Sequence, residues 1–181
     1  ELFQEIVNGN EAKSLRYAFF SEREATKIPD IDKSISAVDV RQAAVVGAGT
    51  MGGGIAMCFA DSGIPVKLLE ISQKFLDTGM AKIKANYETS IKRGSLTAEG
   101  MAERLALIDP VISYDDIANA DMVIEAVFEE MPVKKEVFAK LDAVMKEGAI
   151  MASNTSTLDI DEIASATKRP EAVLGMHFFS R

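Results

Sequence analysis

A short apolar segment, residues 43–46, runs directly into Gly47-Ala48-Gly49-Thr50-Met51-Gly52, a Gly-x-Gly-x-x-Gly loop, and residues 53–62 then predict a helix. In a strand–loop–helix unit of this kind, the first glycine allows a tight turn and the second lets a pyrophosphate approach the backbone. The third lets the helix pack closely on the strand. The N–H groups and partial positive charge of the helix N-terminus attract phosphates. Five residues are therefore predicted to bind a dinucleotide: Gly47, Gly49, Thr50, Met51 and Gly52.

An acidic residue follows the second predicted strand, residues 66–69. This residue is Glu70, which comes 18 residues after Gly52. A carboxylate there is expected to bond the adenosine ribose hydroxyls and to repel a 2′-phosphate. No Lys or Arg occupies positions 71–73, although Lys74 follows. The sequence favours NAD over NADP, the alternative being a glycine turn with an incidental surface glutamate.

Strand-like and helix-like segments alternate from residue 43 onward. The expected strands are residues 43–46, 66–69, 111–113, 122–125, 150–153 and 173–177, and the expected helices are residues 53–62, 72–93, 97–107, 132–148 and 159–167. This alternation predicts an α/β fold, a Rossmann-type doubly wound and mostly parallel sheet with helices on both faces. Residues 1–40 differ, with an amphipathic helix at 15–26 and a polar connector after Pro29. We therefore expect a linker helix and connector over 1–40 and a dinucleotide-binding domain over 41–181.

Composition excludes several classes of function. The net charge of −8 argues against binding to nucleic acid or to an anionic membrane surface. Residues 43–60 carry no charge, but their many glycines make them too weakly apolar to form a membrane span. Cys58 is the only cysteine, so no disulfide can form within the chain, which fits a reducing compartment, the cytoplasm. Its side chain is expected in the core. One His and one Cys cannot build an ordinary zinc site.

Two polar features lie near the end of the chain. Residues 154–157, Asn-Thr-Ser-Thr, follow a predicted strand, at the edge of an open α/β sheet where ligands bind. Ser156 or Thr157 could instead cap the helix beginning near 159, and one loop can do both. His177, the only histidine, ends an apolar strand, where a histidine is commonly structural. An imidazole is also suited to accept the proton of an alcohol during hydride removal.

Together these motifs resemble the NAD-binding domain of the L-3-hydroxyacyl-CoA dehydrogenase family. The matching segments are the glycine loop, residues 123–127 with Glu129, residues 152–156, and Gly175-Met176-His177-Phe178-Phe179. The resemblance implies that His177 is the base that takes the 3-hydroxyl proton, that Ser156 bonds the substrate oxygen, and that Asn154 lines the same pocket. It also implies that Glu129 and Lys134 contact the nicotinamide half of the cofactor, the alternative being that both are surface charges. The resemblance further implies that Ala126 and Val127 bind the cofactor.

Residues 17–29 resemble the linker between the hydratase and dehydrogenase parts of multifunctional fatty-acid β-oxidation proteins. The resemblance implies an acyl-CoA substrate and two neighbouring parts of a parent chain, a hydratase domain and a C-terminal helical domain. Relatives usually continue after the two phenylalanines with Asn or Ser and then Pro, whereas here Ser180 is followed by Arg181. The glutamate that orients the histidine in this family lies beyond that point. We therefore expect this chain to bind NAD but to turn substrate over poorly.

Two other functions stay open from the sequence. One is a cofactor-binding module without chemistry. The other is a β-hydroxyacid dehydrogenase, which has a similar glycine loop but a lysine base on a later helix. The polar loop at 153–156 followed by His177-Phe178-Phe179 disfavours the second.

Overall fold

The computed structural model describes residues 2–28, 31–32 and 34–179. The sequence predictions that involve Pro29, Ser180 and Arg181 fall outside these residues. The chain divides into two compact units, Glu1–Val38 and Asp39–Arg181. Each unit is described by itself.

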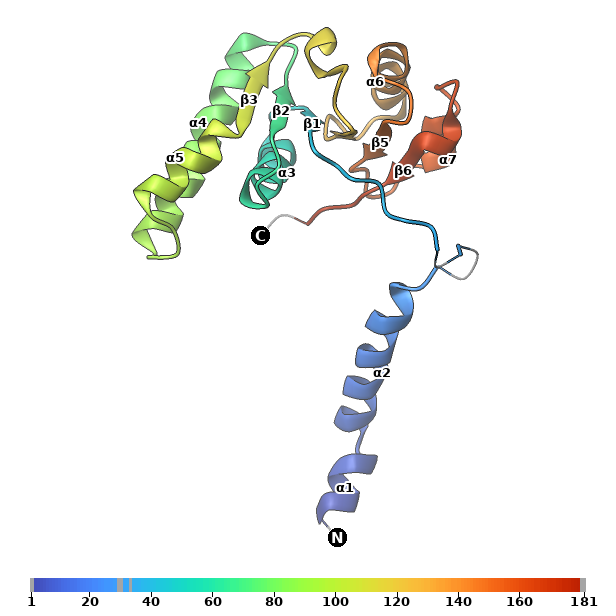
Figure 1. Ribbon diagram of the computed structural model, residues 1–181. Helices are drawn as coiled ribbons and strands as arrows, with labels where there is room; N and C mark the ends of the chain where they lie inside the picture. Colours follow the sequence, from blue (N-terminus) through green and yellow to red (C-terminus); the bar gives the residue numbers. More distant parts are fainter. Residues whose placement is uncertain (1, 29–30, 33, 180–181) are drawn as a thin grey trace. The chain divides into compact units, whose positions relative to one another are not determined.

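The second unit is built on a six-stranded sheet with the order β3-β2-β1-β4-β5-β6 (Figure 1). Every pair of neighbouring strands is parallel. The central strands are mostly apolar because both of their faces are covered, as in parallel sheets generally. The strands are β1 (Ala43–Val46), β2 (Val66–Leu69), β3 (Ile108–Val111), β4 (Met122–Glu125), β5 (Ile150–Ser153) and β6 (Val173–Gly175).

Helices cover both faces of this sheet. On one face Val45 packs in a core that includes Ile55 and Ile83, and on the other face Val46 packs in a core that includes Phe138. The first face is covered by α3 (Thr50–Asp61), α4 (Gln73–Lys92) and α5 (Ala98–Ala106). The second face is covered by α6 (Met131–Val144) and α7 (Ile160–Ala164). The predicted doubly wound Rossmann-type fold is confirmed, with two short 3₁₀ helices at Tyr114–Ile117 and Pro170–Ala172.

Two predicted strands have different bounds in the structure. Strand β3 includes Asp109 and Pro110, which the sequence analysis placed before the strand. Proline is tolerated there because β3 is an edge strand that pairs only with β2, so its missing N–H disrupts no central ladder. Strand β6 ends at Gly175, so His177 follows the strand and does not belong to it.

The helix of the glycine loop also departs from expectation. It begins at Thr50 and not at residue 53, since Gly49 already serves as its N-cap. Cys58, which we expected in the core, is exposed on this helix. The predicted ends are confirmed by glycines with positive φ, 76° at Gly63 after α3 and 74° at Gly94 after α4.

The first unit contains α1 (Leu2–Asn8) and α2 (Asn10–Ala25). The sequence analysis expected one helix over 15–26, and the helical segment instead begins well before it. Neither helix buries any of its described residues, so apolar side chains such as Phe3, Leu15 and Phe20 stand exposed. Among the described helices, none is both long and apolar enough to cross a membrane.

Candidate functional site

The glycine loop joins β1 to α3 with little room for side chains. Gly47 adopts a φ of 102°, which favours glycine. A Cβ on Gly52 would lie 1.8 Å from the carbonyl oxygen of Gly47, so only glycine lets α3 start this close to the loop. A Cβ on Gly49, by contrast, would meet nothing within 4 Å. The fold therefore demands Gly47 and Gly52, whereas Gly49 leaves open space beside the N-terminus of α3.

Glu70 reaches back from the end of β2 to this loop. Its Oε2 accepts a hydrogen bond from the backbone N–H of Ala48 (3.1 Å), and its Oε1 accepts one from the N–H of Ile71 (2.9 Å). The carboxylate is thus held at the carboxyl edge of the sheet, beside the glycine loop. This is the position in which an acidic group can bond ribose hydroxyls.

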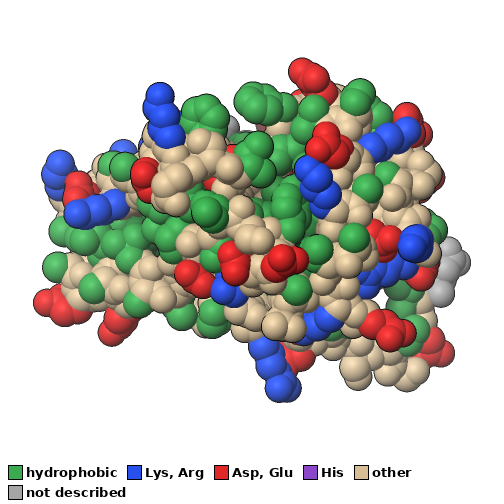
Figure 2. All heavy atoms as spheres, turned by 90° about the horizontal axis from the view of Figure 1, so that it is seen from above, with side chains coloured by type: hydrophobic (Ala, Val, Ile, Leu, Met, Phe, Trp, Pro, Cys, Tyr) green, Lys and Arg blue, Asp and Glu red, His purple; other side chains and the backbone are tan. Residues whose placement is uncertain are grey.

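A cavity of about 610 Å³, here called the larger cavity, extends over this region. Most of its wall is apolar, and Glu70, Tyr114 and Lys140 are among its polar residues. Figure 2 shows one face of the molecule, on which Lys and Arg side chains are interspersed with Asp and Glu and do not form a broad basic area. An anionic ligand would therefore depend on the local N–H groups of the loop. The predicted residues in the wall are Gly47, Gly49, Thr50, Met51, Glu70, Ala126 and Val127.

A second cavity of about 370 Å³, here called the polar cavity, lies against the C-terminal ends of β4 and β5. It shares three wall residues with the larger cavity: Met51, Ala126 and Val127. The rest of its wall consists of Glu129, Lys134, Asn154, Ser156, His177, Phe178 and Phe179. The predicted base, the predicted polar residues and part of the glycine loop are thus brought together around one cavity.

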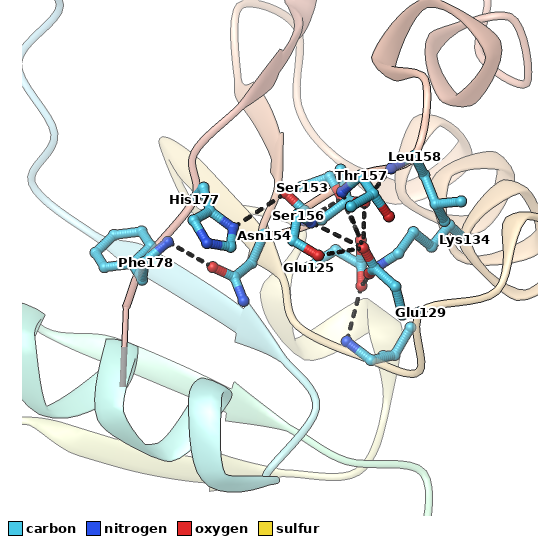
Figure 3. Close-up of polar contacts among 12 residues, drawn as sticks. Glu125, Glu129, Lys134, Ser153, Asn154, Ser156, Thr157, Leu158, His177 and Phe178 are labelled. Carbon is cyan, nitrogen blue, oxygen red and sulfur yellow. Dashed lines mark hydrogen bonds and ion pairs between the residues drawn. The ribbon is translucent and has the colours of Figure 1, made fainter. Parts of the chain in front are cut away.

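The carboxylate of Glu129 holds the polar loop after β5 (Figure 3). Its Oε1 accepts hydrogen bonds from Thr155 Oγ1 (2.6 Å) and from the N–H (2.8 Å) and Oγ (3.2 Å) of Ser156. Its Oε2 lies 3.2 Å from Nζ of Lys134. Burial raises the pKa of Glu129, but the hydrogen bonds from Thr155 and Ser156 and the ammonium of Lys134 outweigh it and lower the pKa to about 2. Glu129 is therefore anionic at neutral pH.

Beneath this loop lies a buried ionic group. Nζ of Lys134, on α6, is 2.7 Å from Oε1 of Glu125, the last residue of β4, and both side chains are almost fully buried. The same Oε1 accepts the N–H of Val127 (2.7 Å), and Oε2 accepts the hydroxyl of Ser153 (2.6 Å). Lys134 is therefore not a surface charge, which was one of the two alternatives for it. It joins two carboxylates, one buried and one at the cavity wall.

His177 and Asn154 stand on the opposite side of the loop from Glu129 (Figure 3). Nδ1 of His177 lies 3.3 Å from the carbonyl oxygen of Thr155. Because a carbonyl only accepts hydrogen bonds, this contact is a hydrogen bond only in the tautomer that has the proton on Nδ1, in which Nε2 is the basic nitrogen. Oδ1 of Asn154 accepts the N–H of Phe178 (2.8 Å), which leaves the amide NH₂ of Asn154 to donate elsewhere.

The structure also answers the question of which residue caps α7. The carboxylate of Asp159 accepts hydrogen bonds from the N–H groups of Asp161 and Glu162, so Ser156 and Thr157 are not the cap. Both residues instead turn N–H groups toward Glu129. Sequence reasoning assigned no role to Glu125, Ser153 or Thr155. A glutamate at the end of an apolar strand was the available signal, since a charge there needs a partner.

A parallel sheet with strand order 3-2-1-4-5-6 and a glycine loop after β1 defines a dinucleotide-binding domain of the Rossmann type. The model of one family, "3-hydroxyacyl-CoA dehydrogenase, NAD binding domain", matches residues 42–181. The chain belongs to this family, whose cofactor is NAD. The resemblance drawn from the sequence motifs is thereby confirmed.

Known relatives place this domain within longer proteins. The chain is similar to a peroxisomal bifunctional enzyme of Cavia porcellus (43% identity over 186 positions, 99% of this chain, 25% of the relative). It is also similar to the fatty acid oxidation complex subunit alpha of Pseudomonas putida (41% over 178 positions, 98% and 25%). Among solved structures, it resembles the 3-hydroxybutyryl-CoA dehydrogenase of Escherichia coli (TM-score 0.76, 40% identity, 79% of this chain, 30% of that chain). The chain thus spans about a quarter of the curated relatives it matches.

Proposed function

We propose that this site oxidises an L-3-hydroxyacyl-CoA thioester to the 3-ketoacyl-CoA with NAD as the oxidant. One observation carries the proposal. The polar cavity is lined both by Met51 of the glycine loop and by Ser156, Asn154 and His177. A cofactor bound along the larger cavity can therefore reach the same space as a base and two polar groups.

The residues around the larger cavity fit NAD. Gly49 leaves space for a pyrophosphate beside the α3 N-terminus, and as a glycine it contributes no capping side chain that would occupy the N–H groups there. Glu70 would bond the adenosine ribose, and Ala126 and Val127 would contact the cofactor where the two cavities join. When bound, NAD supplies the hydride acceptor.

The side chains of the polar cavity have separate tasks in this proposal. Nε2 of His177 accepts the proton of the 3-hydroxyl while the hydrogen on C3 leaves with its electron pair, so that the alcohol carbon becomes a carbonyl. Ser156, placed at the wall by Glu129, bonds the substrate oxygen. Asn154 offers its NH₂ group to the same substrate. Glu129 and Lys134 shape the wall beside the nicotinamide.

The wider setting of the domain is part of the proposal. The Cavia porcellus relative, which matches 99% of the chain, is named a bifunctional enzyme, whereas the Escherichia coli dehydrogenase structure matches 79% of the chain. This difference supports residues 1–40 as a linker that joins the NAD-binding domain, residues 41–181, to a hydratase domain, with a helical domain following. Of the two relatives described, one is named peroxisomal and the other is bacterial, so placement in the cytoplasm stays a prediction.

Calorimetric titration of this chain with NAD and then with NADP tests the cofactor part. We expect saturable NAD binding and at least tenfold weaker NADP binding.

The chemistry is tested by NADH formation from L-3-hydroxybutyryl-CoA, with 3-hydroxyisobutyrate as the competing small acid. We expect slow turnover of the thioester only, and its loss in H177Q. If the chain binds NAD but H177Q forms NADH from the thioester as fast as the unmodified chain, the chain is a cofactor-binding module without this chemistry. Turnover of the small acid would instead favour a β-hydroxyacid dehydrogenase.

A further inference from the structure

Two lysines of the described chain, Lys82 and Lys140, line the larger cavity. Lys140 already has a partner, since its Nζ lies 2.7 Å from Oε1 of Glu136. Lys82, on α4, is exposed and forms no ion pair with any described residue. Its ammonium is therefore available to an anionic group of a ligand in this cavity.

Helix α4 passes close to the glycine loop on both sides of Lys82. A Cβ on Gly79 would lie 2.5 Å from the carbonyl oxygen of Ala48, and a Cβ on Gly53 would lie 3.4 Å from Cγ1 of Ile83. Lys82 comes one turn after Gly79 and directly before Ile83. Because long side chains on a helix lean toward its N-terminus, that of Lys82 is directed over the turn that touches Ala48. The ammonium can therefore reach the space in front of the glycine loop.

The loop alone does not balance the charge of a bound pyrophosphate. The pyrophosphate of a dinucleotide is a dianion, whereas the N-terminus of a helix is equivalent to about half a positive charge. The net charge of −8 adds no attraction, and the carboxylate of Glu70, bonded to the N–H of Ala48, adds local repulsion. A lysine at the wall of the same cavity supplies the missing positive charge.

We propose that the ammonium of Lys82 binds the pyrophosphate of the dinucleotide at the glycine loop. This inference rests on the cofactor part of the proposed function, because it adds a residue to the site of the same ligand. It does not depend on the chemistry at His177. Binding measured without substrate therefore tests it.

The test is calorimetric titration of the unmodified chain and of K82M with NAD and with ADP-ribose. ADP-ribose keeps the pyrophosphate but lacks the nicotinamide. Both ligands should bind about five- to tenfold more weakly to K82M, as loss of one close charge pair near solvent implies. K82R keeps the charge and should retain most of the affinity. High salt should narrow the difference between K82M and the unmodified chain, because the pair is exposed to screening.

K84M is the matched control. Lys84 lies on the same helix and is also exposed, but among the described residues it belongs to the wall of neither cavity. K84M and K82M remove the same charge, so the general attraction of the chain for anions changes equally in both. We expect K84M to bind NAD and ADP-ribose as the unmodified chain does.

Equal affinities of K84M and K82M for NAD, with K82M shown to be folded by circular dichroism, would overturn this proposal and leave the proposed function standing. Weaker binding of free coenzyme A by K82M, with no change for NAD or ADP-ribose, would overturn it as well, since Lys82 would then serve another phosphate ligand. A chain that shows the expected loss in K82M but does not oxidise the thioester would refute the proposed chemistry and support the role of Lys82. Binding of neither dinucleotide ligand by the unmodified chain would overturn both.

Discussion

Lys134 and Glu125 form an ion pair in the interior of the domain, with 2.7 Å between Nζ and Oε1 and exposed side-chain fractions of 1% and 0%. A buried pair of this kind gives little net stability compared with apolar residues of the same shape, yet breaking it leaves a charge without a partner. The pair joins the end of β4 to the first turn of α6, and the segment between these elements lines the polar cavity at Ala126, Val127 and Glu129. We therefore expect the pair to place these elements more than to stabilise the fold.

The first prediction concerns this pair. K134M keeps the length of the side chain but leaves the Glu125 carboxylate buried and unpaired, so we expect a loss of about 3–5 kcal/mol in the free energy of unfolding. The neighbouring variant K135M is the control, because Lys135 pairs with Glu162 on the surface and should cost less than about 1 kcal/mol. Urea unfolding at pH 7 measures both. Equal losses in the two variants would contradict a charged, desolvated pair.

A double variant sharpens this prediction. E125Q/K134M leaves no buried charge, so we expect it to recover part of the stability that K134M loses. A double variant that is less stable than K134M would show that the carboxylate of Glu125 is sustained mainly by Ser153 and the N–H of Val127.

The second prediction separates cofactor binding from folding at two glycines. A Cβ at Gly49 or at Gly54 would meet nothing within 4 Å, so the fold tolerates alanine at both. Gly54 lies within α3, where alanine favours the helix by about 1 kcal/mol. Gly49 faces the space where the pyrophosphate must approach the backbone. Calorimetry should show at least tenfold weaker NAD binding in G49A and unchanged binding in G54A. Alanine is a poorer N-cap than glycine, so G49A should lose at most about 1 kcal/mol of stability, and G54A should lose none.

The third prediction concerns the choice of dinucleotide. E70Q removes the negative charge beside the loop but keeps a side chain that can accept the N–H of Ala48. Hydrogen bonds to charged groups contribute about 1.5–3 kcal/mol, so NAD binding should weaken by about tenfold or more. NADP binding should weaken less or improve, since its 2′-phosphate no longer meets a carboxylate. E147Q, at an exposed position, is the control and should leave both affinities unchanged.

Much of the fold could be predicted because its signals are local. The segments that became β1, β2, β4 and β5 are short and mostly apolar, and the structure gives them the predicted bounds. The spacing of Gly47, Gly49 and Gly52 predicted a strand–helix turn, and the close approach of Gly52 to the Gly47 carbonyl is its physical reason. Strand β3 was misplaced because a proline is excluded from a central strand but not from an edge, and the sequence does not say which strands are edges.

The site was predictable in composition but not in its connections. The sequence motifs predicted Ser156, Asn154 and His177 as site residues, and all three line one cavity. The hydrogen bonds that hold them depend on residues brought together by folding, such as Glu125 with Ser153 and Glu129 with Thr155. Periodicity and spacing carry no information about such pairs, because each member looks ordinary within its own segment. For the same reason, the sequence left Lys134 as either a cofactor contact or a surface charge and did not predict that it is buried beside Glu125.

The last prediction uses the pH dependence of stability. The pKa of Glu129 is lowered from 4.5 to about 2 in the folded chain. A carboxylate whose folded pKa is depressed contributes stability that is fully present above its unfolded pKa and is lost as the pH falls through the folded pKa. The contribution of Glu129 should therefore be complete above about pH 4.5 and decline between about pH 4.5 and 2. Because 40% of the side chain is exposed, solvent screening limits it to about 1 kcal/mol.

E129Q has no carboxylate to titrate, so the difference in unfolding free energy between E129Q and the unmodified chain should shrink as the pH falls below about 4.5. Both proteins keep Asp121, whose pKa is lowered to about 2 by the ammonium of Lys146 and the N–H groups of Gln42 and Arg41. Acid therefore destabilises both, and only the difference reports on Glu129. Urea unfolding at pH 7, 4.5 and 3, with E147Q as control, measures it. A constant difference across this range would mean that Glu129 holds the loop equally well when protonated.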